Sequence, residues 1–131
     1  MHFFNATGLD PSPTQSGGYG SASDLAKLFV YTLDTHPEIF SATAYSKFTT
    51  KSLDKINHIA INTDIDIDKI PGIIGSKTGF TDLAGGNLAV VYDAGLDYPI
   101  IAIVLGSTYN DRFTDMTSLV NATNATLSLQ K

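Results

Sequence analysis

Three apolar, β-branched runs lie close together in the second half of the chain, and they restrict the possible folds more than any other feature. They cover residues 70–79, residues 87–92 and the run from Pro99 to Leu105. Short runs rich in Ile and Val, bounded by turn residues, are typical of buried strands. Residues 93–97 supply such turn residues between the last two runs. We therefore expect an antiparallel three-stranded sheet.

Helical patterns flank the predicted sheet on both sides. Ser21 and Asp24 have the spacing of a capping box, and apolar residues then recur at helical spacing: Leu25, Leu28, Phe29 and Leu33. Pro37 ends this helix or begins a short helical turn through Phe40. After the sheet, one apolar stripe predicts a closing helix: Phe113, Met116, Leu119, Val120 and Leu127.

The expected architecture is an α/β fold of the layered α+β type. It combines the three-stranded antiparallel sheet with an N-terminal helical segment and a packed C-terminal helix. Residues 8–20 are rich in Gly and Pro and predict an irregular loop, and residues 41–57 predict short strands or loops. A length of 131 residues fits a single domain, residues 1–131.

Composition excludes several classes of function. Eight Lys and Arg against thirteen Asp and Glu give a net charge of −5, which argues against nucleic acid or anionic lipid as main partners. The chain has no cysteine, so disulfides, thiolate zinc sites and cysteine nucleophiles are excluded. We expect no transmembrane segment and no signal peptide. We also expect no cofactor, and no metal site, since His2, His36 and His58 do not have the spacing of metal ligands.

Two further patterns are weak functional signals. Asp64, Asp66 and Asp68 imitate the opening of a calcium loop, but Lys69 stands where that loop needs glycine and Gly75 where it needs glutamate. We expect an extended segment with these carboxylates on a solvated face. N-x-T sequons begin at residues 5, 121 and 124, a pattern short enough to arise by chance.

A K-T-G sequence closes the first predicted strand and is the strongest chemical signal. The Lys77 ammonium would favour anionic neighbours, the Thr78 hydroxyl could donate to a carboxylate, and Gly79 would admit a substrate backbone. Strict alternation places Lys77 and Thr78 on opposite faces, so a shared site requires a twist or bulge that Gly79 permits. The alternative is a surface lysine that protects an edge strand from aggregation.

Several segments match, in order, the motifs of one enzyme family. Residues 4–10 fit N-x-x-G-L-D, residues 19–26 fit S-x-x-D-[LM]-A, and residues 62–63 with 70–81 fit N-T-N…G-x-K-T-G-x-T; residues 82–88, 104–107 and Arg112 continue the match. The chain thus resembles the serine-type D-alanyl-D-alanine carboxypeptidases, the low-molecular-weight penicillin-binding proteins of peptidase family S11. The resemblance implies a partial DD-peptidase/β-lactamase-like fold, the C-terminal portion of a penicillin-binding transpeptidase-like domain.

The resemblance also implies a chemistry, in which a serine attacks the bond between two terminal D-alanines of a peptidoglycan stem peptide. β-Lactams would be ligands of the complete enzyme. Lys77 would be the catalytic residue present here, assisting proton transfer. The substrate-binding residues would be Thr78, Gly79, Phe80, Thr81 and Arg112. Thr78 and Arg112 would hold the terminal carboxylate, and the strand backbone would bind the peptide. A different interpretation of Arg112 is an exposed cation near a helix start.

Two motifs of this family are not found in the family's order in this sequence. The family needs S-x-x-K for its nucleophile and S-x-N for a second hydroxyl, but no S-x-N occurs here. The S-x-x-K at Ser52 to Lys55 follows the N-x-x-G-L-D segment and has the wrong order, and a second S-x-x-K, Ser128 to Lys131, lies still later in the sequence. We expect the chain to be inactive alone, and its status as an enzyme stays open. The alternatives are a non-catalytic module that binds peptidoglycan peptides or a partner, and a complementing half of a split enzyme.

Location and assembly are expected from the family alone. Peptidoglycan lies outside the cytoplasm, so we expect the periplasm or the outer face of the cytoplasmic membrane. In the family, N-terminal strands lie beside the last strand of the sheet. Without them, the run from Pro99 to Leu105 would be an apolar open edge, which predicts a homodimer or another strand-swapped assembly.

Overall fold

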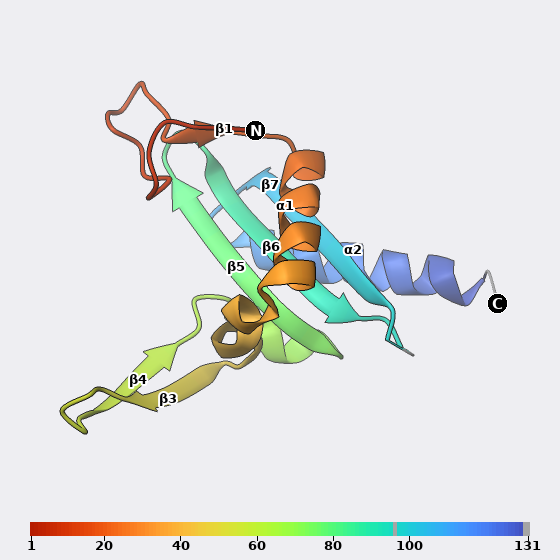
Figure 1. Cartoon of the computed structure of the whole chain (residues 1–131). Helices are drawn as coiled ribbons and strands as arrows, with labels where there is room; N and C mark the ends of the chain where they lie inside the picture. The colour runs from red at the N-terminus through yellow and green to blue at the C-terminus, as the bar shows by residue number, and fades with distance from the viewer. Residues whose placement is uncertain (96, 130–131) are drawn as a thin grey trace.

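The structure of the protein is a computed structural model, which describes residues 1–95 and 97–129. A three-stranded antiparallel sheet lies at its centre (Figure 1). Its order is β5 (Ile73–Thr81), β6 (Gly85–Asp93) and β7 (Pro99–Ser107). The predicted sheet is therefore confirmed. The first strand begins later than predicted, because the chain turns at Gly72, where φ is +72°. Of the predicted turn at residues 93–97, Leu96 lies outside the described residues.

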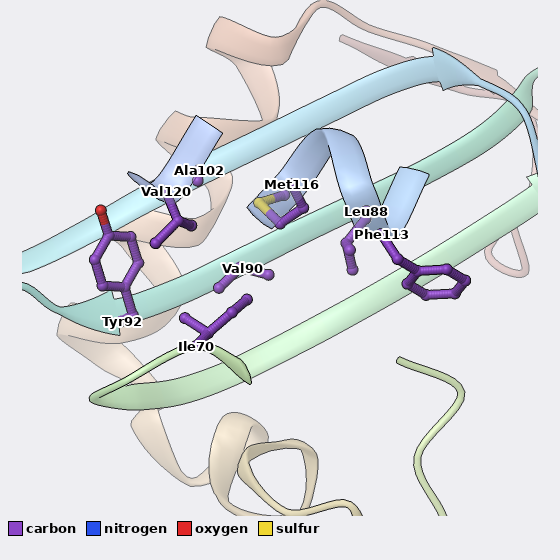
Figure 2. Packing of buried hydrophobic residues seen from close by; sticks show 8 residues of the cluster. All are labelled: Ile70, Leu88, Val90, Tyr92, Ala102, Phe113, Met116 and Val120. Carbon is purple, nitrogen blue, oxygen red and sulfur yellow. The ribbon is translucent and has the colours of Figure 1, made fainter. Parts of the chain in front are cut away.

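Helix α2 (Asp111–Ser128) packs on one face of the sheet and forms the core with it. Figure 2 shows the cluster of buried side chains that joins them: Ile70, Leu88, Val90, Tyr92, Ala102, Phe113, Met116 and Val120. The predicted stripe is correct at Phe113, Met116 and Val120. It is wrong at Leu119, which is 38% exposed, because neighbouring residues point about 100° apart around a helix.

Helix α1 (Ala22–Thr35) and the 3-10 helix η1 (Pro37–Ala44) lie on the opposite face. Figure 1 shows α1 crossing in front of the sheet while α2 passes behind it. The capping box is confirmed, since Ser21 Oγ accepts from Asp24 N–H and Asp24 Oδ2 accepts from Ser21 N–H, both at 3.1 Å. Only Phe40 of η1 is buried here, against Gly75, whereas no side chain of α1 is buried.

Two small sheets lie outside this core. Strands β1 (His2–Phe3) and β2 (Gly18–Tyr19) pair beside the N-terminal loop, and neither was expected from the sequence. Strands β3 (Lys47–Lys51) and β4 (Asn57–Ile61) form a hairpin in which every strand residue is exposed. Figure 1 shows this hairpin projecting away from the central sheet. Of the short strands or loops predicted over residues 41–57, β3 is confirmed, whereas residues 41–44 belong to η1 and β4 lies almost wholly after that range.

The acidic segment that follows β4 is not the solvated strand we expected. Its backbone turns into η2 (Ile67–Lys69), where Lys69 N–H donates to the Asp66 carbonyl. This turn places the Asp64 side chain inside the protein, where it is 1% exposed, and buries Ile67 as well. Among the described residues, no helix is both long and apolar enough to cross a membrane.

Candidate functional site

The K-T-G sequence lies on β5, the outer strand of the sheet. Lys77 pairs with Ala89, Thr78 with Leu88 and Gly79 with Asn87. The β5–β6 register is regular at these positions and shifts only between Ile73 and Gly75, so of the twist or bulge that a shared site would require, β5 has no bulge at Gly79. Lys77 and Thr78 therefore start on opposite faces, as alternation requires.

Both side chains nevertheless line one hollow, because no strand of the described residues covers the outer edge of β5. Lys77 Nζ donates to the Thr78 carbonyl oxygen at 2.5 Å, next to the hollow that both residues line. The hollow has a volume of about 450 Å³. It is lined by Thr7, Gly8, Leu9, Thr63, Lys77, Thr78, Gly79, Phe80, Thr81, Ala84, Asn87, Tyr109 and Arg112.

All six residues singled out from the sequence thus meet at one place. A larger hollow of about 660 Å³ lies between the N-terminal loop, α1 and the β5–β6 turn. No charged side chain is among the described residues that line it. We therefore place the candidate site at the smaller hollow, which is lined by charged and hydroxyl-bearing side chains.

Arg112 is not the exposed cation of the alternative interpretation, since it is only 4% exposed. Its Nη1 donates to the Gly79 carbonyl at 2.9 Å, which ties the start of α2 to β5. Its Cζ also lies 4.6 Å from the centre of the Tyr109 ring and 4.7 Å from that of Phe113. A planar guanidinium held on several sides is preorganised to bind a carboxylate.

Thr63 is a further hydroxyl of the site to which sequence reasoning gave no role. Its Oγ1 lies 2.5 Å from Thr78 Oγ1, within hydrogen-bonding distance. Thr63 was part of a matched family segment, but the sequence alone does not show that the chain after β4 returns to β5. Tyr109 was also missed, and its ring packs edge-on against Phe80 with centroids 5.1 Å apart.

The N-terminal loop closes one end of the hollow. Asn5 Oδ1 accepts hydrogen bonds from the backbone N–H groups of Thr7 and Gly8, which shapes the loop that reaches the hollow. Asp10 Oδ1 accepts a hydrogen bond from the Gly17 N–H at 3.1 Å within the same loop, and the Thr81 hydroxyl and then the Gly17 N–H hold the pKa of Asp10 below its usual value. The Asn and Asp of the N-x-x-G-L-D segment thus stabilise the conformation of this loop through their side-chain hydrogen bonds.

Ser52 does not belong to this site. It lies in the turn of the β3–β4 hairpin, its Oγ accepts from Ile56 N–H at 3.2 Å, and it does not line the hollow. No helix begins there, as an S-x-x-K nucleophile would need. No group of three His, Asp or Glu side chains that could hold a metal occurs in the described part of the chain.

Comparison with known proteins places this fold in the class of the D-alanyl-D-alanine carboxypeptidases and penicillin-binding proteins. The chain belongs to the D-alanyl-D-alanine carboxypeptidase family of peptidase family S11, whose family model matches residues 1–109. Among curated proteins, none matches the sequence significantly.

The chain is also similar to solved structures of penicillin-binding proteins and of a D-alanyl-D-alanine carboxypeptidase. Penicillin-binding protein D2 from Listeria monocytogenes, in its ampicillin-bound form, matches with a TM-score of 0.74 and 29% identity, over 91% of this chain and 46% of that one. Its cefotaxime-bound form matches with a TM-score of 0.73 over the same shares, again at 29% identity. The D-alanyl-D-alanine carboxypeptidase from Mycobacterium tuberculosis H37Rv shares the fold, with a TM-score of 0.64 and 21% identity, over 86% of this chain and 42% of that one. This chain spans about half the length of these relatives.

Proposed function

We propose that this chain is the C-terminal portion of a serine-type D-Ala-D-Ala carboxypeptidase domain and supplies substrate-binding groups to its site. The observation that carries the proposal is the meeting of Lys77, Thr78 and Arg112, from two separate elements, at one hollow beside the open edge of β5. Family membership and coverage of 46% of penicillin-binding protein D2 support it. The ampicillin and cefotaxime bound in that relative make β-lactams the expected ligands of the complete domain.

The substrate in this proposal is a peptidoglycan stem peptide ending in D-Ala-D-Ala. Its terminal carboxylate binds the Thr78 hydroxyl and the Arg112 guanidinium, a pairing of hydroxyl and cation that suits a carboxylate. The peptide backbone lies along Gly79, Phe80 and Thr81, because an open strand edge can accept an extended peptide.

The reaction is acyl transfer to a serine that this chain does not supply. The serine of an S-x-x-K motif attacks the carbonyl between the two D-alanines, D-alanine leaves, and water then hydrolyses the acyl-enzyme. Lys77 assists proton transfer and stabilises negative charge near the reacting bond. Since no S-x-N occurs and Ser52 lies outside the hollow, the chain alone does not catalyse this reaction.

A titration with N-acetyl-D-alanyl-D-alanine tests the binding role. We expect weak binding, with a dissociation constant of about 1 mM, because only part of the site is present. Thr78→Val should weaken binding about tenfold by removing the hydroxyl, while Thr49→Val on exposed β3 should not change it. Tight binding would favour the non-catalytic binding module, and the absence of any binding would contradict a hollow assembled by this chain.

The assembly and location follow from the same proposal. In the described residues β7 pairs only with β6, so its outer edge offers free backbone groups to another strand. We propose a homodimer through this edge, from Pro99 to Leu105, and a strictly monomeric chain in light scattering at micromolar concentration would contradict it. The proposed location is extracytoplasmic, in the periplasm or at the outer face of the cytoplasmic membrane, where peptidoglycan lies.

A further inference from the structure

The loop between β4 and β5 brings a second hydroxyl to the K-T-G strand, and the proposed reaction makes no use of it. Thr63 Oγ1 lies 2.5 Å from Thr78 Oγ1, and both residues line the hollow. Within the described part of the chain, this contact is the only hydrogen bond of either hydroxyl. The Thr63 hydroxyl therefore makes no bond to its own loop, and its place against Thr78 needs another explanation.

Asn62 fixes the backbone just before Thr63. Its Nδ2 donates to the carbonyl oxygens of Thr43 at 3.1 Å and of Tyr45 at 3.2 Å. Its backbone N–H donates to the Ser46 carbonyl at 2.9 Å. These three carbonyls lie at or just after the end of η1. The loop is thus attached to η1 without any contribution from the Thr63 side chain.

The end of η1 is in turn attached to β5. Ser76 N–H donates to Thr43 Oγ1 at 3.3 Å. On the other side of Thr63, Asp64 is 1% exposed, and its N–H donates to Asn62 Oδ1 at 2.9 Å. Thr63 itself is exposed. The backbone on either side therefore holds Thr63 in place while its hydroxyl stays open to the hollow.

The protons of the two hydroxyls can be arranged in two ways, because each hydroxyl donates one proton and can accept others. If Thr78 donates to Thr63, the Thr78 proton points away from a ligand. If Thr63 donates to Thr78, the Thr78 proton is free to bind a ligand oxygen in the hollow. The second arrangement uses both protons when a carboxylate is bound, and hydrogen bonds in such a chain strengthen one another.

We propose that Thr63 is a positioning residue for Thr78: its hydroxyl donates to Thr78 Oγ1 and directs the Thr78 proton toward the terminal carboxylate of the ligand. The proposal rests on the proposed function for the nature of the ligand. A side chain that is held in one rotamer loses less conformational freedom when a ligand binds. Arg112 is already held by the Gly79 carbonyl. The carboxylate then meets two groups that are oriented before it binds.

A double-mutant cycle tests the proposal in the full chain, with N-acetyl-D-alanyl-D-alanine titrated by NMR. Thr63→Val keeps the shape, removes the hydroxyl and should weaken binding about fivefold. Thr63→Ser should stay within about twofold of the wild type, because it keeps the hydroxyl. In a Thr78→Val background, adding Thr63→Val should change the affinity less than about twofold, since Thr63 acts only through Thr78. Thr49→Val on exposed β3 is the control and should change nothing.

Two results of this cycle would overturn the proposal. One is an unchanged affinity of Thr63→Val while Thr78→Val binds more weakly. The other is an equal loss from Thr63→Val with and without the Thr78 hydroxyl, which would mean that Thr63 binds the ligand directly. If Thr78→Val itself leaves the affinity unchanged, or if no binding occurs, the proposed function fails, and the role of Thr63 is decided by a measurement without ligand.

That measurement uses the NMR couplings that report the χ1 angle of Thr78. The proposal requires one χ1 rotamer in the wild type and a mixture of rotamers in Thr63→Val, or in Thr63→Ala if the valine variant does not fold. Mixed rotamers in the wild type, or the same single rotamer in the variant, would overturn it. A Thr78 that is fixed in the wild type and released in the variant, without ligand binding, would contradict the proposed function and leave the role of Thr63 established.

Discussion

The two faces of the central sheet are covered very differently. On the α2 face, Met116 and Val90 have no exposed surface and Val120 is nearly as buried. On the α1 face, the helix buries none of its side chains, and Leu28 is 40% exposed. A stable helix normally buries its apolar side. The α2 face therefore has a complete core, whereas α1 and the β3–β4 hairpin present exposed apolar side chains.

This difference explains where the candidate site stands. Arg112 belongs to α2 and is anchored on the completed face, so this chain alone positions the residue proposed to bind a carboxylate. The outer edge of β5 pairs with no strand of the described residues. A chain that spans 46% of penicillin-binding protein D2 would have this form if a second portion completed the site.

The largest expected effect is a difference in stability loss between core variants on the two faces of the sheet. Met116→Ala should lower the free energy of unfolding by about 3 kcal/mol, because it leaves a cavity in a closed core. Leu28→Ala on α1 should cost only about 0.5 kcal/mol, since that side chain stays largely in solvent. Urea denaturation of both variants gives the comparison. Equal losses would show that the α1 face is packed as tightly as the α2 face.

Alanine substitutions at two glycines should affect different properties, stability at Gly86 and peptide binding at Gly79. A Cβ at Gly86 would lie 1.9 Å from the Thr108 carbonyl oxygen, so Gly86→Ala should destabilise the protein by about 2 kcal/mol. A Cβ at Gly79 would meet nothing closer than 3.8 Å, so Gly79→Ala should fold normally and weaken only peptide binding. Thermal melting and the peptide titration measure the two properties. A destabilised Gly79→Ala would mean that this glycine is structural.

The capping box gives a smaller effect on the weakly packed face. Ser21→Ala removes the side-chain oxygen that accepts from Asp24 N–H and should cost about 1 kcal/mol. Circular dichroism during thermal unfolding would show it. A control, Ser118→Ala, removes a hydroxyl from α2 that only bonds back to the Thr114 carbonyl, and its effect should be smaller. A larger loss for the control would argue that α1 contributes little to stability.

The smallest effect is a pH dependence centred on Asp64. Its folded-state pKa lies above the value of 3.8, chiefly because of burial. The folded state then binds the proton more tightly than the unfolded state, so this group destabilises the fold as the pH rises from 3.8 through the raised pKa. The stability of Asp64→Asn relative to wild type should therefore increase over that window and level off above it. A constant difference in urea titrations at several pH values would contradict a raised pKa.

Sequence patterns predicted the sheet and α2 because each carries a local period that matches its burial. They also identified Lys77, Thr78 and Arg112, since a resemblance to a family names residues in order. They failed at Asp64, where alternation suggested a solvated strand but the turn into η2 places the carboxyl inside. This error concerns tertiary placement, which depends on how the chain returns to β5 and not on local spacing.

The central claim is that this chain holds substrate-binding groups of a penicillin-binding site but not its nucleophile. Intact-mass measurement of the purified chain after incubation with benzylpenicillin tests it most directly. The account predicts an unchanged mass, because no serine of the hollow belongs to an S-x-x-K motif. A stable acyl adduct would contradict the account. It would make Ser52 the first candidate nucleophile and require a different arrangement of the site.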